Sequence, residues 1–104
     1  MTGPMLSEIT PLILTFNEEA NIQRTLARLS WAQDIVVVDS GSTDATLHIL
    51  RAHPRVRIIG RAFSSHAEQW NHGLRATGIR TEWVLALDAD YALTDEFIAE
   101  VAAL

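Results

Sequence analysis

Two carboxylates separated by one small residue follow an apolar run near the end of the printed sequence. Residues 83–87 are largely apolar, which predicts a buried strand, and Asp88-Ala89-Asp90 comes directly after them. Ligands of open parallel α/β sheets bind beyond the carboxyl ends of the strands, where these side chains would emerge. Paired carboxylates are hard oxygen donors that suit Mg²⁺ or Mn²⁺, and a metal bound there would face a polyanionic ligand.

Polar side chains also follow two earlier apolar runs. Thr15 lies near the end of the run over residues 9–16, and Asn17 follows it directly. Residues 35–38 lead into a polar turn over residues 39–44. In a sheet with strand order 3-2-1-4, the three polar strand ends would lie side by side, so one ligand could touch all of them. Acids at two of these ends, a hydroxyl-rich turn and helix N-termini suit a nucleoside diphosphate bridged by a divalent metal.

The spacing of apolar residues predicts four strands that alternate with four helices. The strands are expected over residues 9–16, 35–38, 56–59 and 83–87, after a loose lead-in over residues 1–8. The helices are expected to begin near Asn17, Thr43, Ser65 and Thr94, whose side chains suit helix N-termini. This order predicts an α/β fold: a Rossmann-like parallel sheet with helices on both faces and right-handed crossovers.

Two of these helices have apolar stripes that we expect to face the sheet. The third helix would pack through Ala67, Trp70 and Leu74, and the last through Phe97, Val101 and Leu104 with Ile98 alongside. We interpret the other tryptophans as packing residues and the four histidines as surface or core residues, because the histidines lack metal-ligand spacing.

Composition restricts the class of function. The 104 residues form one domain at most, and a net charge of −5 without a basic run argues against nucleic-acid binding. All eight cations are Arg, which excludes a Schiff-base lysine and a P-loop lysine, and the absence of Cys excludes a zinc-thiolate site. No apolar run approaches the roughly 20 residues that span a bilayer. We therefore expect a cytoplasmic protein, and peripheral attachment to the inner membrane face is compatible with this sequence.

The strand ends taken together resemble a known enzyme family. The resemblance rests on the order and spacing of four segments, residues 14–19, 36–44, 71–76 and 87–90. They are similar to the family 2 glycosyltransferases, nucleotide-sugar enzymes of the GT-A fold, over about residues 9–98. The Asp39-Ser40-Gly41 variant and residues 65–70 are more similar to the bacterial branch that builds lipopolysaccharide and other surface glycans.

The resemblance implies a role for each matching strand end. Thr15 and Asn17 would line the nucleotide pocket, and Asp39 would lie beside the base or the ribose. Asp90 would be the direct ligand of Mn²⁺ or Mg²⁺, while Asp88 would contact the ribose or the metal. These positions together would bind the donor and its metal.

The implied reaction is metal-assisted transfer of a sugar from a nucleotide sugar, expected to be a UDP-sugar, to a glycan or lipid-linked acceptor. The anomeric carbon would be inverted, with a base deprotonating the acceptor hydroxyl. The family often has a second acid that contacts uracil, and Ser40 at that position leaves the base open. Arg61 and Arg75 could reach the diphosphate. Because the base lies in the family's second half, we expect the sequence to continue past Leu104 and this chain to supply the donor and metal site only.

Other interpretations of the same residues remain open. The chain could be a non-catalytic nucleotide-binding module or an inactive fragment. A phosphatase of the haloacid dehalogenase type also has Asp-x-Asp after a strand, but it expects Thr or Val four residues after the first Asp, where this chain has Ala92. Asp39 and Asp44 could simply accept hydrogen bonds from turn amides.

Overall fold

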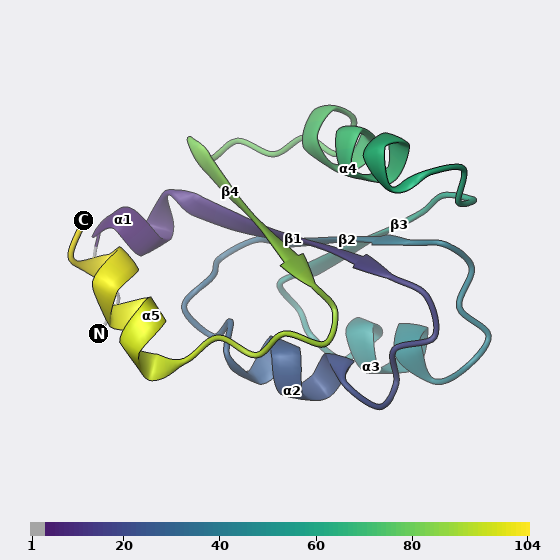
Figure 1. The fold of residues 1–104 in the computed structure, drawn as a ribbon, viewed down its shortest axis with the longest axis horizontal. Coiled ribbons are helices and arrows are strands. Elements are labelled where there is room, and N and C mark those ends of the chain that lie inside the picture. Colours follow the sequence, from purple (N-terminus) through teal and green to yellow (C-terminus); the bar gives the residue numbers. More distant parts are fainter. Residues whose placement is uncertain (1–3) are drawn as a thin grey trace.

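Four parallel strands form the centre of the fold in a computed structural model that describes residues 4–104 (Figure 1). They are β1 (Ile9–Thr15), β2 (Ile35–Asp39), β3 (Val56–Gly60) and β4 (Trp83–Asp88), in the spatial order β3-β2-β1-β4. The predicted strand order is confirmed, and each predicted strand is correct to within one residue. The register pairs Thr15 with Asp39 and Leu14 with Asp88. The polar ends of β1, β2 and β4 therefore lie at one edge of the sheet.

Helices cover both faces of this sheet. They are α1 (Pro4–Ser7), α2 (Ile22–Ala27), α3 (Thr46–Arg51), α4 (His66–Arg75) and α5 (Asp95–Ala102). Figure 1 shows α2 and α3 below the sheet, α4 above it, and α5 beside α1 at one end. The α1 turn buries Leu6 and corrects the expected loose lead-in, because that side chain joins the main core; residues 1–3 of that segment lie outside the described part. Within residues 4–104, no helix is long and apolar enough to cross a bilayer.

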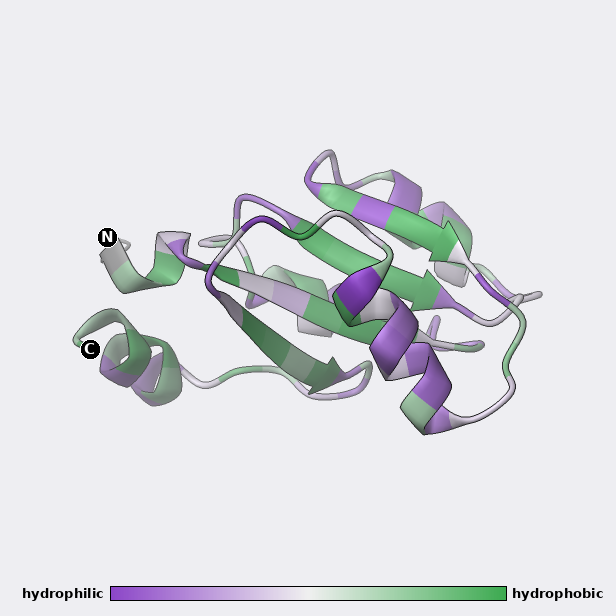
Figure 2. Ribbon diagram, turned by 90° about the horizontal axis from the view of Figure 1, so that it is seen from above, coloured by the Kyte–Doolittle hydropathy of each residue, from purple (hydrophilic) through white to green (hydrophobic). Residues whose placement is uncertain are grey.

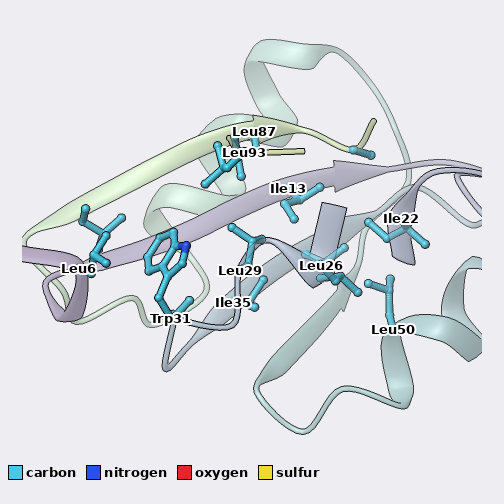
Figure 3. Close-up of a cluster of buried hydrophobic side chains, with 14 residues drawn as sticks. Leu6, Ile13, Ile22, Leu26, Leu29, Trp31, Ile35, Leu50, Leu87 and Leu93 are labelled. Atoms are coloured by element: carbon cyan, nitrogen blue, oxygen red, sulfur yellow. The ribbon is translucent and has the colours of Figure 1, made fainter. Parts of the chain in front are cut away.

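The sheet separates two apolar clusters of unequal size. The larger cluster lies between the sheet and α2, and includes Ile13, Leu26 and Leu87 (Figure 3). The smaller one comprises Leu12, Val36 and Val38 under α4. Every residue of β2 is buried, as expected for a central strand between two layers. Figure 2 shows the consequence for hydropathy: the strands are mainly hydrophobic, whereas α4 is mostly hydrophilic.

Two helices begin later than their sequences predict. Asn17 does not cap a helix; its φ is +52°, and α2 begins at Ile22 after Asn21. The left-handed backbone at Asn17 turns the chain away from helical geometry, which Asn tolerates better than most residues. Likewise α3 begins at Thr46 because the carboxylate of Asp44 accepts the Thr46 amide in a turn. The expected caps of α4 and α5 are confirmed: Ser65 accepts from the Glu68 amide, and Thr94 accepts from the Phe97 amide.

The expected packing face of α4 is partly wrong: Trp70 packs on the smaller cluster, but Ala67 and Leu74 do not face the sheet. Gln69 and Gly73 are its buried residues, whereas Ala67 and Leu74 are exposed. The helix approaches the sheet so closely that a Cβ on Gly73 would lie 2.7 Å from Cδ1 of Leu12. Close approach therefore selects the residue without a side chain, and the apolar stripe through Trp70 turns partly outward.

The expected inward face of α5 is partly wrong as well. Ile98 and Val101 pack against the larger cluster, whereas Phe97 and Leu104 are exposed. The helix ends at Ala102, so Leu104 lies beyond its last turn.

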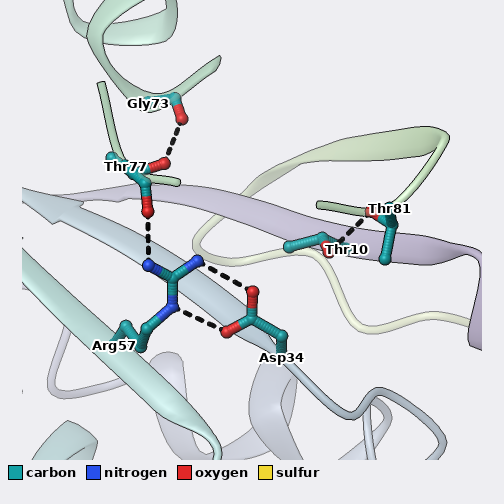
Figure 4. A network of polar contacts seen from close by, with 6 residues as sticks. All are labelled: Thr10, Asp34, Arg57, Gly73, Thr77 and Thr81. Carbon is teal, nitrogen blue, oxygen red and sulfur yellow. Dashed lines mark hydrogen bonds and ion pairs between the residues drawn. The ribbon is translucent and has the colours of Figure 1, made fainter. Parts of the chain in front are cut away.

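Polar contacts at the amino end of the sheet hold the strands there (Figure 4). Arg57 of β3 forms two 2.8 Å hydrogen bonds with the carboxylate of Asp34 and also donates to the carbonyl of Thr77. The hydroxyls of Thr10 and Thr81 lie 2.8 Å apart. These contacts are at the edge opposite the polar strand ends, so they stabilise the sheet away from the candidate site.

Candidate functional site

An open cleft of about 390 Å³ lies at the carboxyl edge of the sheet. Its walls come from the ends of β1 and β4, the residue after β2 and the segment that enters α4. The lining residues are Leu14, Thr15, Phe16, Glu18, Ser40, Phe63, His66, Gln69, Trp70, Leu87, Asp88, Ala89 and Asp90. The three strand ends predicted to meet thus do meet, and this confirms the expected edge of the sheet.

Asp88 and Asp90 place their carboxylates at this cleft because the residue between them is anchored in the core. Ala89 is buried, while both neighbouring acids are exposed. The Tyr91 amide donates to the Asp88 carbonyl at 3.0 Å and closes a turn around Ala89. The spacing of the two acids therefore has a structural cause: one small residue points inward and the flanking carboxylates remain free for a ligand.

The two carboxylates fit a divalent metal that also binds a phosphate ligand. Among residues 4–104, no group of three or more His, Asp or Glu could by itself hold a metal ion. Mg²⁺ commonly takes only one or two protein carboxylates and fills its remaining positions with waters and substrate phosphates. Asp88 and Asp90 could supply the protein oxygens of such a site.

Asp39 holds the turn that follows β2. Its side chain is 2% exposed, and its Oδ1 accepts from the hydroxyls of Thr15 and Ser42, each at 2.6 Å. Its Oδ2 accepts from the amides of Gly41 and Ser42 at 2.9 and 2.8 Å. Burial raises the pKa of Asp39, but the hydrogen bonds from Ser42, Thr15 and Gly41 outweigh it and lower the pKa below its ordinary value. The interpretation that Asp39 accepts turn amides is confirmed; its contact with a base or ribose stays a prediction.

Asn17 connects the loop after β1 to the loop after β2. The backbone amide of Asn17 donates to Ser42 Oγ at 2.9 Å, and its side-chain Oδ1 accepts from the backbone amide of Thr43 at 2.8 Å. The next two amides, of Glu18 and Glu19, donate to the side chains of Thr46 and Asp44. Asn17 is exposed and is not among the lining residues of the cleft given above, so its role toward a nucleotide stays a prediction.

A second cleft of about 550 Å³ adjoins the first across Ser40, which lines both. Arg51, Arg61 and Asp39 line this second cleft, so it holds two cations and one carboxylate. Buried Gln69 forms the partition: its Nε2 donates to Ser40 Oγ and to the Arg61 carbonyl, and its Oε1 accepts from Arg61 Nη1 at 2.6 Å. Arg75, in the last turn of α4, is not among the described residues that line either cleft.

Sequence reasoning missed the aromatic wall of the first cleft. Phe63 and His66 stand edge to face with ring centroids 5.0 Å apart, and half-buried Trp70 lies on the same wall. Trp70 also packs on the smaller apolar cluster, so its expected packing role is correct but incomplete. The signal that could have found this wall was the position of all three residues around the cap at Ser65, directly after a strand end.

Comparison with known proteins identifies the family of this chain. The family model described as Glycosyl transferase family 2 matches residues 12–104. This chain belongs to glycosyl transferase family 2. The matched range contains Thr15, Asn17, Asp39, Asp88 and Asp90, and the family assignment removes the haloacid dehalogenase interpretation.

Individual relatives of this glycosyltransferase chain agree with the family match. An uncharacterized glycosyltransferase of Rickettsia bellii is 28% identical over 102 residues, which are 97% of this chain and 34% of the relative. Another, of Rickettsia typhi, is 31% identical over 97 residues, which are 92% of this chain and 32% of the relative. The crystal structure of Staphylococcus aureus TarS 1-349 superposes with a TM-score of 0.74 at 26% identity, covering 91% of this chain and 31% of that chain. The chain spans about a third of the length of the curated relatives it matches.

Proposed function

We propose that this glycosyltransferase domain binds a nucleoside diphosphate sugar in the first cleft, for transfer of the sugar to a hydroxyl acceptor. One observation carries the proposal: in a family 2 chain, Asp88 and Asp90 lie on the same cleft as Thr15 and Ser40. Two carboxylates alone would repel a diphosphate, so this arrangement requires a cation between them.

The two clefts offer suitable binding surfaces for the metal, the phosphates and the nucleoside of the donor. Asp88 and Asp90 would hold Mn²⁺ or Mg²⁺, which when bound neutralises charge that develops on the nucleoside diphosphate leaving group. The second cleft, with Arg51 and Arg61, suits the nucleoside and its phosphates, and Ser40 lies where the two clefts meet. Arg guanidinium groups bind phosphate oxygens in bidentate geometry. We expect a UDP-sugar as the donor.

The chain's own residues would orient the donor and limit its access to water. Phe63 and Trp70 line the same cleft as the β4 carboxylates and offer apolar ring surface there. The acceptor, a glycan or a lipid-linked sugar, would approach from the open side of the cleft and attack with inversion. We assign the base that takes the acceptor proton to no residue of this chain.

A transfer assay tests this proposal. The full chain is incubated with MnCl₂ and radiolabelled UDP-glucose, UDP-galactose or UDP-N-acetylglucosamine, and retention of the donor and release of UDP are measured with and without a lipid-linked glycan extract. Because no residue of this chain is assigned as the base, we expect Mn²⁺-dependent retention of one labelled donor by this chain, with little release of UDP. UDP release that the extract stimulates would show that this chain itself carries out transfer. An absence of Mn²⁺-dependent donor binding would contradict the proposal.

A further inference from the structure

The segment that carries Asp88 and Asp90 is held by helix α2, which lies more than 60 residues earlier in the sequence. Three side chains of α2 and its C-cap donate to backbone carbonyls of this segment: Thr25 to Ala89 at 2.7 Å, Arg24 to Asp90 at 3.3 Å, and Arg28 to Leu93 at 2.8 Å. Arg28 also pairs with the carboxylate of Asp95 at the start of α5. These contacts fasten the whole connection from β4 to α5.

The bond from Thr25 is the buried member of this set. Thr25 is 0% exposed, and Ala89 is 5% exposed. Their bond is buried, and Ala89 belongs to the same apolar cluster as Leu26 and Leu93. The Ala89 carbonyl belongs to the peptide unit that joins Ala89 to Asp90. Its direction therefore sets the direction in which the Asp90 side chain leaves the turn.

We propose that Thr25 is a positioning residue, which orients the Asp88–Asp90 turn so that both carboxylates face one metal ion; Arg24 supports it at the solvent side. This inference rests on the proposed function. Thr is a poor helix former, and the Thr25 hydroxyl bonds across to another element rather than within its own helix. If packing alone were required, Val would fill the same space.

The test compares three variants in the full chain. Thr25→Val removes the hydroxyl, Thr25→Ser restores it, and Thr10→Val is the matched control. Thr10 is also a buried Thr with a hydroxyl partner, but it lies at the opposite edge of the sheet (Figure 4). We measure the thermal midpoint, the Mn²⁺ dissociation constant in the presence of UDP, and amide hydrogen exchange at Tyr91 in the metal-free protein.

We expect Thr25→Val to raise the Mn²⁺ dissociation constant by about 10-fold, the usual effect of losing a group that orients a metal ligand. Tyr91 exchange should accelerate by a similar factor. Thr25→Ser should stay near wild type, and Thr10→Val should lower the thermal midpoint without changing either quantity. Equal effects of Thr25→Val and Thr10→Val on both would overturn the proposal.

Two further measurements test the positioning role if the metal does not bind or if Thr25→Val does not fold. If wild type shows no metal-dependent UDP binding, the proposed function fails, while Tyr91 exchange still tests the positioning role. If Thr25→Val does not fold, Arg24→Gln takes its place, because the contact of Arg24 with Asp90 is exposed and lies outside the core. We expect it to raise the Mn²⁺ dissociation constant about 3-fold at an unchanged thermal midpoint; an unchanged constant would count against the proposal.

Discussion

The hydroxyl of Thr15 donates a 2.6 Å hydrogen bond to Oδ1 of Asp39 and so joins the carboxyl ends of β1 and β2. The two residues are also register partners in the sheet. The Asp39 carboxylate also accepts three hydrogen bonds from the turn after β2. The pair therefore holds the two strand ends between the clefts in place. A buried carboxylate with this many partners stabilises the fold only while it is ionised.

Acid should therefore destabilise the protein through Asp39. Its folded-state pKa is lowered from 3.8, so its stabilisation is complete above the unfolded pKa and is lost as pH falls through the folded value. We predict a fall in the free energy of unfolding below about pH 4, and a smaller fall in Asp39→Asn. Urea titrations at several pH values measure both. Glu100→Gln is the control, and an equal acid loss in Asp39→Asn and wild type would contradict this role.

Asp90→Ala should abolish metal-dependent nucleotide binding without unfolding the domain. The side chain is exposed and contributes no core contact, so the free energy of unfolding should change by less than about 0.5 kcal/mol. Calorimetric titration of UDP with MnCl₂ measures the binding. Glu96→Ala removes an equally exposed acid from α5 and should bind UDP as wild type does. Retained affinity in Asp90→Ala would show that Asp90 is not the metal ligand.

Gly73→Ala tests the close approach of α4 to the sheet. The added Cβ would overlap buried Leu12, and we expect a loss of about 1–3 kcal/mol, although Ala is the better helix former. Gly60→Ala is the matched control, because no atom lies within 4 Å of its Cβ position. Chemical denaturation of both variants gives the comparison. Equal stability of the two would mean that α4 packs less tightly than described.

A charge in the central strand should be far more costly than one on α4. Val37 is completely buried between Ile13 and Ile58, so Val37→Asp should lose more than about 4 kcal/mol and unfold the domain. Leu74→Asp should lose less than about 1 kcal/mol, because Leu74 is exposed on α4. Circular dichroism and solubility distinguish these outcomes. A folded Val37→Asp or an unfolded Leu74→Asp would reverse the assignment of these faces.

The sheet could be predicted because its signals are local. The apolar run of β2 consists of consecutive residues, and the two acids stand directly at the end of β4, so periodicity and strand-end chemistry were sufficient to predict each of them. The face of α4 was mispredicted for a physical reason: hydrophobic periodicity favours Trp70 and Leu74, whereas the contact with Leu12 selects Gly73, which adds nothing to an apolar stripe.

The sequence predicted the acids of the site, but it did not predict the contacts that hold the loops around them in place. Asn17 adopts a left-handed backbone because its partners are in the loop after β2, and no local pattern identifies those partners. Thr25 and Arg24 looked like ordinary helix residues, because the carbonyls that they hold lie 64 and 66 residues away in the sequence. Such contacts follow from the packing of α2 against the end of β4.

The position of a bound Mn²⁺ ion tests the central claim most directly. Mn²⁺ broadens amide NMR signals of nearby residues, so the full chain is titrated with Mn²⁺ in the presence of UDP. We predict that the signals of Ala89, Asp90 and Ser40 broaden first, while those of Thr10 and Arg57 at the opposite edge of the sheet stay sharp. Broadening centred away from Asp88 and Asp90, or equal broadening at both edges, would contradict it.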